Sequence, residues 1–262
     1  MKKIVIAALV RGYKDKNQYK NLLKRNKNIY KNIILKSENP FDNILFHEGN
    51  ISLDHQEYIK EKSPQSIKFI DVSETFDFDN SLIGKIPDLE RFDMGYRLMC
   101  RFNFFYIWKY VKNYDYIIRI DEDVIINKFD KNLISNLDSD FIFGTAKLSG
   151  ESHEFTNKSL PEELKIILNS SDKAFYNHLF PYTNFYISNI KFWTNVEIET
   201  ILKSLAENEL QIINRWGDLP IIGCILNFKK EEIKLLQGIE YFHLSHRNKL
   251  NFAKKIIGSS IT

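Results

Sequence analysis

The sequence predicts an α/β fold with a mostly parallel central sheet flanked by helices. Apolar strand-like runs alternate with amphipathic helix-like segments over roughly the first 120 residues, which is the order of βαβ units. The chain has 262 residues with 44% hydrophobic and 14% aromatic content, enough for one sizeable core. No Gly/Ser-rich or Pro-rich linker interrupts it, and no repeat is visible. We therefore expect a single domain over residues 1–262, with right-handed crossovers between parallel strands.

The first half of the chain reads as strands separated by helices. The apolar run at the start is short and is followed at once by Arg11 and Gly12, so it is typical of a first strand and not of a secretory signal. Periodicity predicts strands over residues 4–10, 43–47, 67–72 and 116–120, and helices over about 17–34, 53–62 and 93–111.

The second half gives weaker signals. Residues 141–145 and 183–187 are predicted strands, and Thr194 to Glu197 has the spacing of a capping box that opens a helix. That helix would bury one apolar face, made of Ile198, Ile201, Leu202 and Leu205. The polar segment 149–177 is predicted to be irregular. It would form either a mobile lid or acceptor loop, or an ordinary surface excursion.

Charge and composition exclude several classes of function. With 37 basic and 34 acidic residues the net charge is +3, so no nucleic-acid partner is implied. The lysines of the first 40 residues favour a solvated helix face over a patch for anionic lipid. Cys100 and Cys224 lie in apolar segments and are interpreted as reduced and structural. No run approaches the roughly 20 apolar residues that cross a bilayer, so we expect a soluble, cytoplasmic protein, peripheral to a membrane at most.

The strongest functional signal is the acidic cluster Asp121, Glu122 and Asp123 directly after the strand 116–120. Ligands of α/β sheets bind beyond the carboxyl ends of strands, so the cluster lies where a site is expected. Adjacent carboxylates repel one another and favour a cation. Mn²⁺ or Mg²⁺ takes one or two carboxylates and completes its shell with water and phosphate oxygens, which suits a nucleoside diphosphate. The alternative is a solvated acidic turn.

Three further groups of residues could take part in a site. Arg97 and Arg101 share a helix face and could bind phosphates or form structural ion pairs. Asp218 could cap a helix that has Pro220 in its first turn, or face an acceptor hydroxyl as base or orienting group. His243 could complete a metal shell, although a lone histidine is more often structural.

Taken together, these segments resemble the fungal-type α-1,2-mannosyltransferases. Blocks similar to motifs of that family occur in the same order along the chain: residues 96–103, residues 114–124, Asn184-Phe185 with Ile190 and Phe192, Arg215-Trp-Gly-Asp218, and Tyr241-Phe-His243. Leu9-Val10-Arg11 also fits the family's first strand. The combination of Met-Cys-Arg-Phe with Arg-Trp-Gly-Asp is far more specific than any Asp-x-Asp motif.

The resemblance implies a GT-A glycosyltransferase fold, a nucleotide-sugar donor, a Mn²⁺-type ion and retention of anomeric configuration. Residues 1–125 would bind the nucleotide-sugar, and residues 126–262 would bind the acceptor and complete the metal site. By position, Asp123 and His243 correspond to metal ligands and Asp218 to the acidic residue near the acceptor. The positions that correspond to donor-site residues are Arg11, Tyr96, Arg97, Arg101 and Asp121.

Two positions depart from the family pattern. Glu122 stands where the family has proline between its two acids, and Tyr186 stands at the position of a proposed catalytic nucleophile. We interpret Tyr186 as a catalytic residue that supports the charge of the transition state or acts as an unusual nucleophile.

The sequence thus predicts a metal-dependent, retaining glycosyltransferase that moves mannose or a related hexose from a GDP- or UDP-sugar to a glycan or glycoconjugate. The alternatives are a metal-dependent phosphohydrolase or nuclease that uses the same carboxylates, and a non-catalytic nucleotide- or sugar-binding module.

Overall fold

The fold is seen in a computed structural model that describes residues 2–170, 176 and 179–244. Its first half follows the predicted alternation of strands and helices. The elements in order are β1 (Ile4–Leu9), α1 (Lys20–Asn32), β2 (Phe41–His47), α2 (Leu53–Lys62), β3 (Lys68–Asp71), α3 (Met94–Arg101), α4 (Ile107–Val111) and β4 (Tyr116–Ile120). Residues Phe102–Tyr106 form one π-helical turn that joins α3 to α4, so the predicted helix over 93–111 is continuous. Asp93 caps it by accepting a hydrogen bond from the Tyr96 amide.

The central sheet has seven strands in the order β10-β6-β9-β4-β1-β2-β3. Strand β1 pairs in parallel with β2 and with β4, and β2 pairs in parallel with β3. The exception is β9 (Phe185–Asn189), which runs antiparallel to both β4 and β6 (Phe143–Thr145). Strand β10 (Ile233–Leu235) pairs in parallel with β6 at the edge. The prediction of a mostly parallel α/β sheet is confirmed.

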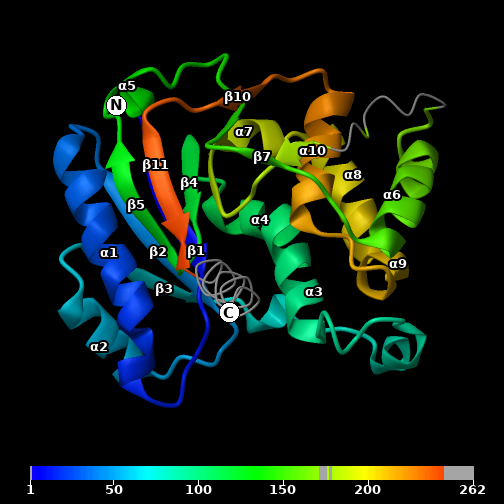
Figure 1. Cartoon of the computed structure of the whole chain (residues 1–262), viewed down its shortest axis with the longest axis horizontal. Helices are drawn as coiled ribbons and strands as arrows, with labels where there is room; N and C mark the ends of the chain where they lie inside the picture. Colours follow the sequence, from blue (N-terminus) through cyan, green and yellow to red (C-terminus); the bar gives the residue numbers. More distant parts are fainter. Residues whose placement is uncertain (1, 171–175, 177–178, 245–262) are drawn as a thin grey trace, which may run out of the picture.

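Alternate residues of the inner strands pack into two separate cores. In β1, Val5 and Ala7 join the larger core, while Ile4 and Ile6 join the core on the other face. Figure 1 shows α1 and α2 on one side of the sheet together with β5 and β11, and α3, α4, α8 and α10 on the other side. The sheet is therefore covered on both faces, which explains why its inner strands are apolar on both sides.

The second half of the chain adds short elements to this framework. The strands β5 (Val124–Phe129) and β11 (Ile239–His243) pair antiparallel to each other, as do β7 (Leu148–Ser149) and β8 (Phe180–Pro181). The helices are α5 (Asn132–Ser135), α6 (Glu154–Ile167), α7 (Ile190–Trp193), α8 (Val196–Glu207), α9 (Glu209–Ile213) and α10 (Asp218–Phe228). The β5–β11 pair is not predicted by the sequence patterns, because neither strand alternates clearly.

Three local predictions are wrong. The described part of segment 149–177 contains the helix α6, whose Pro161 and polar surface hide its helical pattern. Asn195, not Thr194, caps α8, because its side chain accepts a hydrogen bond from the Glu197 amide. Gly217 occupies the N-cap position of α10, and Asp218 is the first helical residue and forms no cap.

Two further observations concern the whole described chain. Cys100 and Cys224 are both free and buried, as predicted. Within residues 2–170, 176 and 179–244, the structure contains no helix with the length and apolar character required to span a bilayer.

Candidate functional site

The order of the strands changes direction between β1 and β4, and we refer to the position beyond the carboxyl ends of these two strands as the crevice. From β1 the chain proceeds outward to β2 and β3, whereas β4 lies on the opposite side of β1. In parallel sheets, ligands bind at such a change of direction, outside the carboxyl ends of the two strands. Arg11 follows the end of β1, and the acidic turn, which we define as Asp121–Asp123, follows the end of β4. Both segments therefore border the crevice.

Helix α1 holds the main chain of the acidic turn through the side chain of Arg25. The Arg25 guanidinium donates to the Ile120 carbonyl oxygen at 2.7 Å and to the Asp121 carbonyl oxygen at 3.1 Å. The Asp121 amide in turn donates to the Asn184 carbonyl oxygen at 3.0 Å. Burial lowers the pKa of Arg25 to about 10, so the guanidinium remains charged at neutral pH. The sequence analysis did not single out this arginine.

Asp123 and His243 meet beyond the carboxyl end of β4, although they are far apart in the sequence. Their atoms Oδ1 and Nε2 lie 2.8 Å apart, and the side chains retain 22% and 16% of their accessible surface. The antiparallel pairing places His243 opposite Val124. The neighbouring Leu244 amide donates to the Asp123 carbonyl oxygen at 3.0 Å. The second histidine of this segment, His246, lies outside the described residues.

Asp121, the first residue of the acidic turn, is paired with a buried arginine. It forms an ion pair of 2.8 Å with Arg119, and Arg119 also lies 3.8 Å from Asp218 at the start of α10. Burial raises the pKa of Asp121 to about 6, although the positive charge of Arg119 acts in the opposite direction. The side chain of Arg119 thus joins two of the predicted site residues. Its signal in the sequence is a single charged residue within an apolar strand.

Tyr186 lies beside Arg119 on the neighbouring strand. The two residues are register partners in the β4–β9 pair, and the Arg119 guanidinium carbon lies 5.9 Å from the ring centre. The tyrosine side chain is fully buried and stacks on Phe143. Its hydroxyl has no hydrogen-bond partner among the described residues. Burial raises the pKa of Tyr186 far above its usual range, so the phenol is neutral.

The side chains of Arg97 and Arg101 contact other groups of the protein. Arg97 is completely buried, forms an ion pair with Asp88 and donates to the Ile212 carbonyl oxygen at 2.7 Å. Arg101 donates to the carbonyl oxygens of Thr75 and Asp77. The Arg97–Asp88 contact matches the structural ion-pair interpretation, whereas the hydrogen bonds of Arg101 among the described residues go to main-chain carbonyl oxygens. Their role in donor binding stays a prediction.

Aromatic and charged side chains pack together between Tyr96 and the start of α10, and we call this group of residues the wall. The Arg215 guanidinium lies over the rings of Phe92 and Tyr96, at 4.3 and 5.5 Å from their centres. It also forms a buried ion pair of 2.9 Å with Glu151. Tyr96 itself is 38% exposed. The wall thus presents an aromatic face close to Asp218.

The sequence and the structure were both compared with known proteins. No family model matches the chain. It is 27% identical over 170 residues to the probable mannosyltransferase MNT3 of Candida albicans, which covers 58% of this chain and 45% of that protein. It is 25% identical over 197 residues to the probable mannosyltransferase KTR3 of Saccharomyces cerevisiae, which covers 65% of this chain and 48% of that protein. The chain is similar in sequence to fungal mannosyltransferases. It spans about half the length of these relatives.

Solved structures of fungal mannosyltransferases share the fold. Core-mannan synthase A of Aspergillus fumigatus, in its Mn/GDP form, matches with a TM-score of 0.73 and 15% identity over 93% of this chain and 75% of that one. The mannosyltransferase Ktr4p of S. cerevisiae in complex with GDP matches with a TM-score of 0.75 and 14% identity over 92% of this chain and 71% of that one. The predicted GT-A fold is confirmed.

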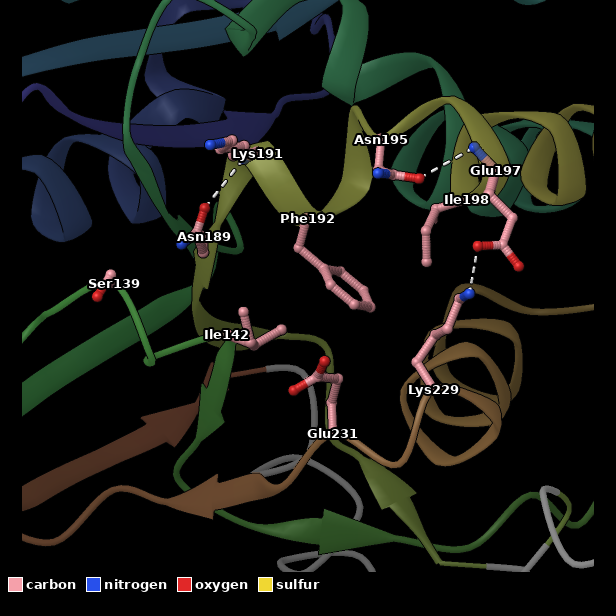
Figure 2. Close-up of a pocket in the computed structure, with 10 residues that line it drawn as sticks. All are labelled: Ser139, Ile142, Asn189, Lys191, Phe192, Asn195, Glu197, Ile198, Lys229 and Glu231. Atoms are coloured by element: carbon pink, nitrogen blue, oxygen red, sulfur yellow. Dashed lines mark hydrogen bonds and ion pairs between the residues drawn. The ribbon is translucent and has the colours of Figure 1, made fainter.

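A hollow lies near the start of β4, and Figure 2 shows the residues that line it. It has a volume of about 330 Å³, and Asn189, which contributes to its lining, pairs with Tyr116 at the start of β4. The side chains of Asn189 and Asn195 accept from helix amides, and Lys229 pairs with Glu197. These contacts cap and join helices. The polar residues that line the hollow are therefore explained by their structural roles.

Proposed function

We propose that this protein is a metal-dependent, retaining glycosyltransferase that transfers mannose or a related hexose from a GDP- or UDP-sugar to a hydroxyl of a glycan or glycoconjugate. The observation that carries the proposal is the contact of 2.8 Å between Asp123 and His243 beside the β1–β4 crevice. Two distant segments meet there in a carboxylate and an imidazole, which are groups that could hold a divalent ion. The GDP-bound fungal relatives support a nucleotide-sugar donor.

The chemistry of the two groups fits an ion such as Mn²⁺ or Mg²⁺. A carboxylate oxygen and a neutral imidazole nitrogen both suit Mn²⁺. The two atoms lie 2.8 Å apart, so one ion could contact both side chains. Among the described residues no group of three or more His, Cys, Asp or Glu side chains is placed to hold a metal. Donor phosphate oxygens and water would therefore fill the other positions.

When bound, the ion would neutralise charge on the diphosphate as the bond between sugar and phosphate breaks. The exposed Arg11 at the edge of the crevice would add positive charge on the nucleotide side. Arg119 holds Asp121 and Asp218 in place from behind. Asp218 would orient the acceptor hydroxyl or take its proton.

Retention of configuration would follow from attack of the acceptor on the same face of the sugar that the phosphate leaves. A route through an enzyme carboxylate at residue 186 is not available, because this chain has tyrosine there. The neutral, buried phenol of Tyr186 supports a packing role beside Arg119 more than a nucleophilic one. Its catalytic role remains a prediction, as do the cytoplasmic location and any contact of the lysine-rich helix with a membrane.

The first experiment is a thermal-shift panel of GDP, UDP and CMP with their sugars, each with and without Mn²⁺. Ligands that bind the native state raise the apparent melting temperature. We expect GDP or UDP to stabilise the protein only when Mn²⁺ is present. Absence of a shift with every nucleotide, or a shift that is equal in chelator, would contradict the proposal.

The second experiment follows transfer with the donor sugar that the panel selects. A glycosyltransferase forms glycosylated acceptor in step with nucleotide release. A phosphohydrolase would release phosphate without acceptor, and a binding module would bind the nucleotide without turnover. Either result would contradict the proposed transfer activity.

A further inference from the structure

The Glu122 carboxylate reaches across the β1–β4 crevice to the segment after β1. One of its oxygens accepts a hydrogen bond from the Arg11 amide at 2.9 Å, and the other accepts from the Tyr13 hydroxyl at 3.4 Å. Glu122 is part of the acidic turn, immediately before Asp123. The carboxylate thus connects the two chain segments that border the crevice.

The segment Arg11–Tyr13 is also fixed on its outer side. The Tyr13 amide donates to the Tyr19 hydroxyl at 3.1 Å, and the two rings meet edge to face at 5.1 Å. Gly12 lies so close to the main chain of Asn50 that a Cβ atom would stand 2.2 Å from its carbonyl oxygen. The segment therefore packs against its own side of the fold, and Glu122 supplies a connection to the opposite side.

This connection belongs to the particular sequence of this chain. The family pattern that the chain resembles has proline between its two acids, and a proline side chain accepts no hydrogen bond. A glutamate here also adds a third negative charge to the acidic turn. Burial raises the pKa of Glu122, and the hydrogen bond and charge of Arg11 oppose that effect. A half-buried carboxylate beside other negative charges is costly without hydrogen-bond donors. The Arg11 amide and the Tyr13 hydroxyl supply these donors to Glu122.

We propose that Glu122 is a positioning residue that holds the segment Arg11–Tyr13 at a fixed distance from Asp123, so that the crevice is pre-organised for a nucleoside diphosphate. The inference rests on the proposed function for the identity of the ligand. The connection between Glu122 and the segment Arg11–Tyr13 is independent of that function, because it can be measured in the free protein. Pre-organisation improves affinity because less conformational freedom is lost on binding.

The test compares Glu122→Ala with Glu122→Gln. Alanine removes both acceptors. Glutamine keeps one oxygen for the Arg11 amide, and its amide group can donate to the Tyr13 hydroxyl, which then acts as acceptor. The matched controls are Glu231→Ala and Glu231→Gln, which change the same residue type in the hollow near the start of β4.

The first readout is hydrogen exchange of the Arg11 amide in the free protein. We expect its exchange to become at least about tenfold faster in Glu122→Ala, which leaves the Arg11 amide without its acceptor, and to stay near wild type in Glu122→Gln, which keeps an acceptor oxygen there. Unchanged exchange in Glu122→Ala would overturn the inference, whether or not the protein binds nucleotide.

The second readout is the Kd of GDP or UDP with Mn²⁺, measured by calorimetry. We expect it to rise about tenfold in Glu122→Ala and less than about threefold in Glu122→Gln and in the Glu231 variants. If glutamine is as damaging as alanine, Glu122 acts through its charge and the positioning role is wrong. Failure of wild type to bind any nucleotide would instead contradict the proposed function.

Discussion

The acidic turn beside the crevice and the wall around α3 and Arg215 arrange their charges differently. In the wall the carboxylates Asp88 and Glu151 are each paired with an arginine, Arg97 and Arg215. In the acidic turn three carboxylates follow one another, and the pKa values of Asp121 and Glu122 are both raised. Because like charges are adjacent there, an added cation would stabilise the turn more than the wall. The difference separates charge pairs that hold the fold from a group of charges that suits a cation.

The largest expected effect is the loss of metal-dependent activity in Asp123→Ala. Removing one of the two proposed protein ligands should lower transfer by at least about 1000-fold, because the ion supplies much of the charge stabilisation. The free energy of unfolding should change by less than about 1 kcal/mol, since the side chain is partly exposed. Mn²⁺-dependent thermal shift, transfer rate and urea unfolding measure these effects.

The control for this variant is Glu240→Ala on β11. Glu240 is a well-exposed carboxylate of the same two-stranded sheet, with Lys128 at 3.8 Å. It should retain full transfer and full response to Mn²⁺. Normal activity of the Asp123 variant in the presence of chelator would refute the metal assignment.

The second effect concerns stability and the wall. Arg97→Met removes the guanidinium from Asp88 and from the Ile212 carbonyl oxygen and puts an unbranched apolar side chain in its place, which should cost about 3–5 kcal/mol in the free energy of unfolding. Lys85→Met is the matched control, because Lys85 forms an exposed pair with Glu209 and should cost less than about 1 kcal/mol. Urea unfolding measures both. A stable Arg97 variant with weakened nucleotide binding would show that Arg97 serves the donor after all.

The third effect lies where the crevice and the wall meet. Asp218→Asn removes the carboxylate that Arg119 orients and should lower kcat by about 100-fold, in the range for a lost acid–base or orienting group. The Kd of the nucleotide with Mn²⁺ should stay within about twofold of wild type, since Asp218 lies on the acceptor side. Steady-state kinetics and calorimetry separate the two quantities. An equal loss of nucleotide affinity would place Asp218 on the donor side instead.

The contrast between the two regions also limits what the sequence can predict. The strands and helices up to Ile120 follow from local periodicity, so their order and type are predicted correctly. The contact of Asp123 with His243 depends on the β5–β11 pair, which no local pattern indicates. It could be expected only from the resemblance to a family. Arg25 acts through tertiary contacts and has no signal in its own segment. Glu122 belongs to the acidic cluster that the sequence indicates, but no local pattern predicts its contact with the Arg11 amide.

The smallest expected effect comes from Tyr186→Phe. The hydroxyl is fully buried without a hydrogen-bond partner among the described residues, so its removal should leave the free energy of unfolding unchanged or raise it by up to about 1 kcal/mol. The ring stays stacked on Phe143 and beside Arg119, so the orientation of Asp121 and Asp218 should persist. We therefore expect transfer within about twofold of wild type. A fall in kcat of more than about tenfold at unchanged stability would instead give the phenol the catalytic role that the resemblance implies.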